Sequence, residues 1–87
     1  MGAGLKRAVA AAKSTRDWRP EVGASYHNGK GSVRRVIDVG PQFVLYQGQA
    51  DRDCLLYEVT AGRNKGRVSN MTVTAFQQWV GKGGKVE

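Results

Sequence analysis

From residue 21 onward the chain alternates between apolar and polar residues, the pattern of strands that bury one face. The alternation predicts five short strands, over residues 22–26, 33–39, 43–46, 55–60 and 67–70. Asn28–Gly31 and Gly40–Gln42 supply turn residues before the second and third strands. This is the pattern of a β-meander, so we expect a mainly β fold.

The second strand is predicted to be half buried. Its apolar face is expected to carry Val33, Ile37 and Val39, with Arg34 and Val36 on the opposite face. The third predicted strand is continuously apolar, which indicates a strand covered on both faces for part of its length.

Two segments have the residue spacing of a helix. In residues 3–16 apolar side chains recur at helical intervals and alanine is abundant, which predicts a basic helical arm over residues 1–20 that ends at Arg19–Pro20. The arm either follows a phosphate backbone or packs across one end of the fold. A short second helix is predicted from the spacing of Val73, Phe76 and Val80, with Thr72 or Thr74 as its N-cap. Gly81 ends this helix, and residues 82–87 are expected to form a flexible tail.

The length of 87 residues leaves room for one small domain, which we assign to residues 21–81. No apolar run approaches the roughly 18 residues of a membrane span, and the first residues lack the uninterrupted apolar core of a secretory signal. Cys54 is the only cysteine, so the chain forms no internal disulfide and no cysteine-based zinc site. We expect a cytoplasmic protein without a membrane partner.

The stretch Tyr26–Tyr46 contains the run Gly-Ser-Val-Arg-Arg-Val-Ile from Gly31 to Ile37. With its glycine-bounded hairpin, this stretch resembles the opening strands of KOW, Tudor and related SH3-like barrels. The size of the chain is also similar to that of small proteins carried by bacteriophages and other mobile elements. The resemblance implies a five-stranded SH3-like barrel, to which the pattern adds an N-terminal helical arm and a short C-terminal helix.

Basic residues give the strongest compositional signal, with 14 Lys and Arg against 7 Asp and Glu and a formal charge of +7. Such a balance favours a polyanionic partner, most often nucleic acid. The candidate nucleic-acid-binding residues form three groups along the sequence: Lys6, Arg7 and Lys13 in the arm, Lys30, Arg34 and Arg35 around the first hairpin, and Arg63, Lys65 and Arg67 around the last. Two hairpins of a small barrel can share one rim, so we expect the second and third groups to form one patch that contacts phosphates. We expect DNA, with duplex DNA slightly favoured, rather than RNA.

Other kinds of binding stay open at this point. The excess charge is also compatible with a solvated surface that has no specific anion. Tyr26, Tyr46 and Tyr57 could stack on bases, or form an aromatic cage if they were clustered and exposed, although strand positions of this kind are more often buried. A protein-interaction adaptor or inhibitor, docking on an acidic partner through a sheet edge or an aromatic rim, is the main alternative function.

The sequence contains no recognisable catalytic or cofactor-binding constellation. Ser25 and His27 lie near each other without a third group that would orient them. Asp51 and Asp53 lack the further oxygen ligands of a calcium loop. The Gly-Lys pairs at residues 29–32 and 81–85 lack the spacing of a phosphate-binding loop. We therefore expect a protein that is not an enzyme and that needs neither a metal nor a cofactor.

Overall fold

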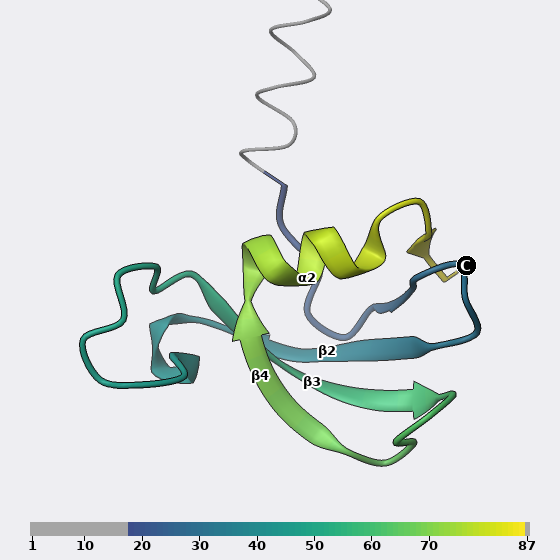
Figure 1. The fold of residues 1–87 in the computed structure, drawn as a ribbon, viewed down its shortest axis with the longest axis horizontal. Helices are drawn as coiled ribbons and strands as arrows, with labels where there is room; N and C mark the ends of the chain where they lie inside the picture. Colours follow the sequence, from purple (N-terminus) through teal and green to yellow (C-terminus); the bar gives the residue numbers. More distant parts are fainter. Residues whose placement is uncertain (1–17, 87) are drawn as a thin grey trace, which may run out of the picture.

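The computed structural model describes residues 18–86, which form a single open sheet of five antiparallel strands with one helix against it (Figure 1). The elements follow in the order β1 (Ser25–His27), β2 (Val33–Val39), the 3-10 helix η1 (Pro41–Phe43), β3 (Cys54–Ala61), β4 (Val68–Thr72), α2 (Val73–Val80) and β5 (Gly84–Lys85). The strand order across the sheet is β4-β3-β2-β1-β5. The prediction of a mainly β fold with a short C-terminal helix is confirmed. Lys6, Arg7, Lys13 and most of the predicted arm lie outside the described residues.

The core lies between the sheet and α2. Phe76 of α2 is fully buried and contacts three aromatic rings from other parts of the chain. Its ring centroid lies 6.1 Å from that of Trp18, 5.6 Å from that of Tyr26 and 6.4 Å from that of Tyr57. Large aromatic side chains supply much of the buried area that a domain of this size can form. Phe76 is therefore the centre of the aromatic contacts of α2, and Val73 and Val80 of the same helix are buried in the same core.

The predicted grouping of Val33, Ile37 and Val39 on one face of β2, opposite Val36, is wrong because the strand contains a bulge. Val36 pairs with Tyr57, but the register then shifts, so that Asp38 pairs with Leu56 and Val39 with Leu55. Residue 37 is the extra residue, and a β-bulge of this kind changes which side chains share a face. Val36 is fully buried and Val39 packs against the same core.

The predicted third strand is also wrong. Residues 41–43 form η1, and an irregular loop follows up to β3. Pro41 fixes its own backbone angle and lacks the N–H that a sheet would use. The carbonyl of Phe43 accepts a hydrogen bond from Asn70 Nδ2 at 2.6 Å. Leu45 and Tyr46 are left 55% and 64% exposed, so these apolar residues lie at the surface and not in the core.

The fifth strand comes from a segment that the sequence predicts as a flexible tail. Thr72 caps α2 by accepting a hydrogen bond from Ala75 N at 3.0 Å. Gly81 ends the helix with a positive φ of 52°. The chain then turns back, and Gly84–Lys85 pairs with β1. Within the described residues, no helix has the length and apolar character needed to cross a membrane.

Candidate functional site

Three connecting segments meet at one end of the sheet: the β1–β2 turn (28–32), the β3–β4 loop (62–67) and the segment after α2 (81–83) (Figure 1). Val33 pairs with Ala61, which brings the first two segments together. A Cβ atom added to Gly62 would lie 2.8 Å from the carbonyl oxygen of Gly31. A Cβ atom on Gly83 would lie 1.9 Å from the carbonyl oxygen of His27. We call this part of the molecule the turn end.

The β1–β2 turn has a defined local geometry. Asn28 Oδ1 accepts hydrogen bonds from the backbone N–H groups of Lys30 at 2.9 Å and Ser32 at 3.4 Å. Gly29 and Gly31 have positive φ values of 77° and 91°, which residues with a Cβ rarely adopt. An asparagine that bonds its own turn and two glycines therefore fix the direction in which Lys30 leaves the backbone.

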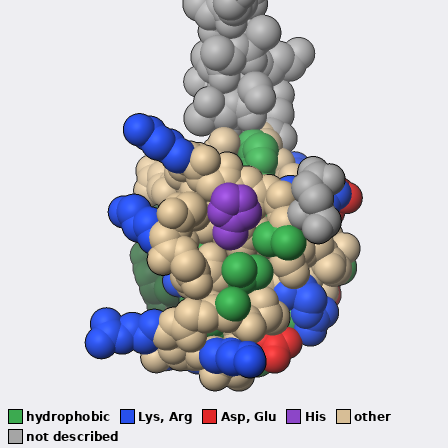
Figure 2. Space-filling view, turned by 90° about the vertical axis from the view of Figure 1, so that its right-hand side faces the viewer, with side chains coloured by type: hydrophobic (Ala, Val, Ile, Leu, Met, Phe, Trp, Pro, Cys, Tyr) green, Lys and Arg blue, Asp and Glu red, His purple; other side chains and the backbone are tan. Residues whose placement is uncertain are grey.

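Cationic side chains gather at the turn end. The exposed members are Lys30, Arg63, Lys65, Arg67 and Lys82. In the part of the chain that the structure describes, none of them forms an ion pair with an acidic side chain. Figure 2 looks directly at this end and shows Lys and Arg side chains projecting around its margin. The cations predicted around the first and the last hairpin are thus brought together in part, since Lys30 lies at the same end as Arg63, Lys65 and Arg67. Lys82, which the sequence analysis assigned to the tail, joins them.

Arg34 and Arg35 do not belong to this exposed group. They are neighbours on a strand and point to opposite faces of the sheet. Arg35 Nη2 lies 3.0 Å from Glu58 Oε1 and forms a half-exposed ion pair. The charge of Arg35 is therefore partly compensated by its own fold.

Arg34 packs on the face that carries the core. Its guanidinium carbon lies 4.5 Å from the ring centroid of Tyr57 and 4.2 Å from that of Trp79. Its Nη1 donates to Met71 Sδ at 3.3 Å, while its Nε is buried without a hydrogen-bond partner among the described residues. Burial lowers the pKa of the Arg34 guanidinium because it disfavours the charged form, and the nearby Tyr57 acts in the opposite direction. Arg34 therefore holds aromatic rings in place beneath the turn end.

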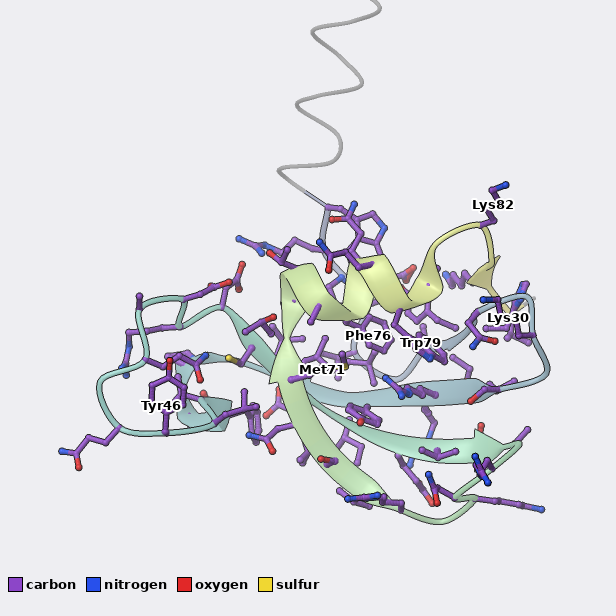
Figure 3. All side chains as sticks on the ribbon, viewed as in Figure 1. Lys30, Tyr46, Met71, Phe76, Trp79 and Lys82 are labelled. Atoms are coloured by element: carbon purple, nitrogen blue, oxygen red, sulfur yellow. The ribbon has the colours of Figure 1, made fainter. Side chains whose placement is uncertain are left out.

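The opposite end of the sheet has a different character. Asp38 and Asp51 are exposed there, and Asp53 pairs with Arg19. The exposed Tyr46 lies at this end, far from the labelled lysines (Figure 3). The exposed cations thus concentrate at the turn end, whereas Arg19 and Arg52 share the opposite end with these three carboxylates.

The three tyrosines do not form a surface cluster. Tyr26 and Tyr57 are only 5% and 9% exposed and belong to the core. Tyr46 lies in the loop between η1 and β3. The structure therefore contradicts both the aromatic cage and a stacking surface made of these three residues. The aromatic ring beside the exposed Lys30 and Lys82 is that of Trp79 in α2, a residue that the sequence analysis did not single out.

Residues considered for catalysis or metal binding have local structural contacts. His27 Nδ1 accepts a hydrogen bond from Gly29 N at 3.2 Å. Asp51 Oδ1 accepts one from Asp53 N at 3.1 Å, within the loop before β3. Cys54 is fully buried. Among residues 18–86, His, Cys, Asp and Glu side chains do not gather in groups of three or more that could hold a metal ion.

Comparison of the chain with models of protein families, with curated proteins and with solved structures finds no significant match.

Proposed function

We propose that this protein is a small non-enzymatic module of the SH3-like barrel type that binds nucleic acid through backbone phosphates, with duplex DNA as the favoured form. The observation that carries the proposal is the group of exposed cations at the turn end, which form no ion pair with an acidic side chain among residues 18–86. The strand order β4-β3-β2-β1-β5, with a helix between β4 and β5, supports the SH3-like assignment because it is a meander whose last strand returns to the first.

The cations come from three separate segments, so they cover a surface and not a single point. Several cations at such a surface neutralise several phosphates and release their counterions, which makes binding favourable and dependent on salt. Lys30, Arg63, Lys65, Arg67 and Lys82 are the proposed anchors. Contacts with phosphates position a protein on the duplex without reading its sequence, so the proposed binding has little sequence specificity.

The remaining candidates have other roles in this proposal. Arg34 positions aromatic rings, and Arg35 adds less than the anchors because Glu58 already pairs with it. The predicted basic arm, with Lys6, Arg7 and Lys13, supplies auxiliary contacts with the backbone.

Fluorescence anisotropy with labelled duplex DNA, single-stranded DNA and RNA at two salt concentrations tests the proposal. We expect binding to the duplex that weakens steeply with salt. The triple variant Arg63→Gln, Lys65→Gln, Arg67→Gln should bind at least about tenfold more weakly and reduce the salt slope by roughly 2 to 3. Arg52→Gln is the matched control, since Arg52 is exposed but lies before β3 at the other end of the sheet. Absence of binding at low salt, or equal losses in the triple variant and the control, would contradict the proposal.

A second candidate is a protein-interaction adaptor or inhibitor of the phage or mobile-element type, acting on an acidic partner. The exposed loop that carries Leu45 and Tyr46 favours it. Gln49, which is buried, accepts a hydrogen bond from Leu45 N at 2.8 Å and so holds the loop in one shape. Exposed tyrosines such as Tyr46 are typical anchors of protein interfaces. The double variant Leu45→Ser, Tyr46→Ser should abolish binding to a protein partner and leave affinity for the duplex unchanged.

A further inference from the structure

A cleft with a volume of about 570 Å³ lies between the β1–β2 turn and the C-terminal end of α2. Its lining residues are Asn28, Lys30, Gln78, Trp79, Gly81 and Lys82. The volume falls in the range of about 300–1,000 Å³ that is usual for sites of small ligands. Figure 3 shows Lys30 and Lys82 at the turn end, with Trp79 on the inner side of both.

The indole of Trp79 is fixed in position. The Arg34 guanidinium carbon lies 4.2 Å from the centroid of this ring, and the Phe76 ring lies 5.5 Å away. Trp79 is nevertheless only half-buried and contributes to the lining of the cleft. A ring that its neighbours already hold loses little conformational freedom when a ligand stacks on it, which favours binding.

The chemistry of the lining is specific to a class of ligand. Trp79 offers an aromatic surface, Lys30 and Lys82 offer positive charge, and Asn28 and Gln78 offer amide groups. The described lining contains no carboxylate and no aliphatic side chain. A planar, polar ring that carries a phosphate fits this combination, whereas an acyl chain or a cationic ligand does not.

We infer that this cleft binds an unpaired nucleotide of a DNA strand, with the base stacked on Trp79 and the flanking phosphates between Lys30 and Lys82. The inference rests on the proposed function, because the turn end must first hold the DNA backbone. Stacking on an aromatic side chain needs only the face of a base, so it tolerates any sequence. The protein then prefers duplex ends with an overhang to blunt duplex.

A comparison of three labelled hairpin duplexes tests the cleft separately from the phosphate contacts. One is blunt, one carries a three-thymidine overhang, and one carries an overhang of three abasic nucleotides. The two overhangs add the same charge and differ only in their bases. We expect the thymidine overhang to bind about tenfold more tightly than the abasic overhang, in line with the strength of stacking one base.

Two variants locate the effect. Trp79→Leu should reduce the difference between thymidine and abasic overhangs to less than about twofold. The double variant Lys30→Gln, Lys82→Gln should weaken both overhang duplexes more than it weakens the blunt duplex, because its lysines contact the flanking phosphates. Lys65→Gln is the matched control, because Lys65 lies at the same end but outside the lining, and it should weaken all three duplexes by the same factor. Because Trp79 also contacts the core, a further readout uses Trp18→Phe, in which Trp79 is the only tryptophan. The thymidine overhang should quench its fluorescence more strongly than the abasic overhang.

The outcomes separate the two proposals. Equal affinities for thymidine and abasic overhangs, with equal quenching of Trp79 fluorescence, would overturn the cleft assignment. The proposed function would still stand if the blunt duplex bound in a salt-dependent way. A preference for the thymidine overhang that persists undiminished in Trp79→Leu would also overturn the cleft assignment. Absence of binding to all three duplexes at low salt would overturn both.

Discussion

Arg34 allows a test of whether a charged residue on the core face acts through packing or through its charge. In Arg34→Ala the side chain that lies over Tyr57 and Trp79 is removed. Two cation–π contacts of about 0.5–1 kcal/mol each are lost, together with the packing of the aliphatic stem. We expect the free energy of unfolding to fall by about 2–3 kcal/mol, a large fraction of the stability of a small domain.

Arg34→Met is the informative comparison. It keeps a long side chain and places a thioether against two aromatic rings, an interaction that is itself favourable. It also removes the buried Nε that has no hydrogen-bond partner among the described residues and relieves the desolvation that lowers the Arg34 pKa. We expect a loss of less than about 1 kcal/mol. Arginine stays protonated throughout the usual pH range, so this difference should not change between pH 5 and 8.

Urea unfolding, followed by tryptophan fluorescence and by circular dichroism, measures both variants. The midpoint should shift far more in Arg34→Ala than in Arg34→Met, with similar slopes. Equal and small losses in both variants would show that the guanidinium does not pack against the rings. Equal and large losses would show that the fold needs the charge, and either result would refute the packing role.

Two smaller predictions concern the backbone, and the same urea assay checks them. Thr72→Ala removes the cap that accepts a hydrogen bond from Ala75 N and should cost about 1 kcal/mol; no change would contradict the role of this cap. Gly62→Ala should cost more than Gly23→Ala, because both positions have φ near +90° but only at Gly62 does the new Cβ meet another backbone atom, the Gly31 carbonyl oxygen at 2.8 Å. Equal losses at the two glycines would show that the β1–β2 turn and the β3–β4 loop do not constrain each other.

The sequence pattern predicted most of the sheet and its helix because these segments have clear periodicity. The strand around Leu55–Thr60 and the helix around Phe76 were predicted within a few residues of β3 and α2. The fifth strand could not be predicted, since Gly84–Lys85 has no strand propensity and pairs only because the turn at Gly81 returns the chain to β1.

The errors arose where tertiary context outweighed local pattern. A bulge at residue 37 placed Val39 on the same face as Val36, although the alternation predicted opposite faces for them. The apolar run at 43–46 does not form the predicted strand, because it follows Pro41. The side-chain amides of Gln49 and Asn70 bond the backbone of this run, in place of a neighbouring strand. The candidate site was found in part: the hairpin cations were proposed from the sequence, but the position of Lys82 and Trp79 beside them depends on how α2 packs. The periodicity of apolar residues along the sequence does not show where α2 places these two side chains.

The measurement that most directly tests the central claim is a titration of the isotopically labelled protein with duplex DNA, followed by two-dimensional NMR of the backbone amides. The account predicts that the largest changes in amide chemical shift occur at residues 28–32, 62–67 and 81–83, and that these changes diminish as salt is added. Changes centred on the loop around Leu45 and Tyr46, or spread evenly over the surface, would contradict it.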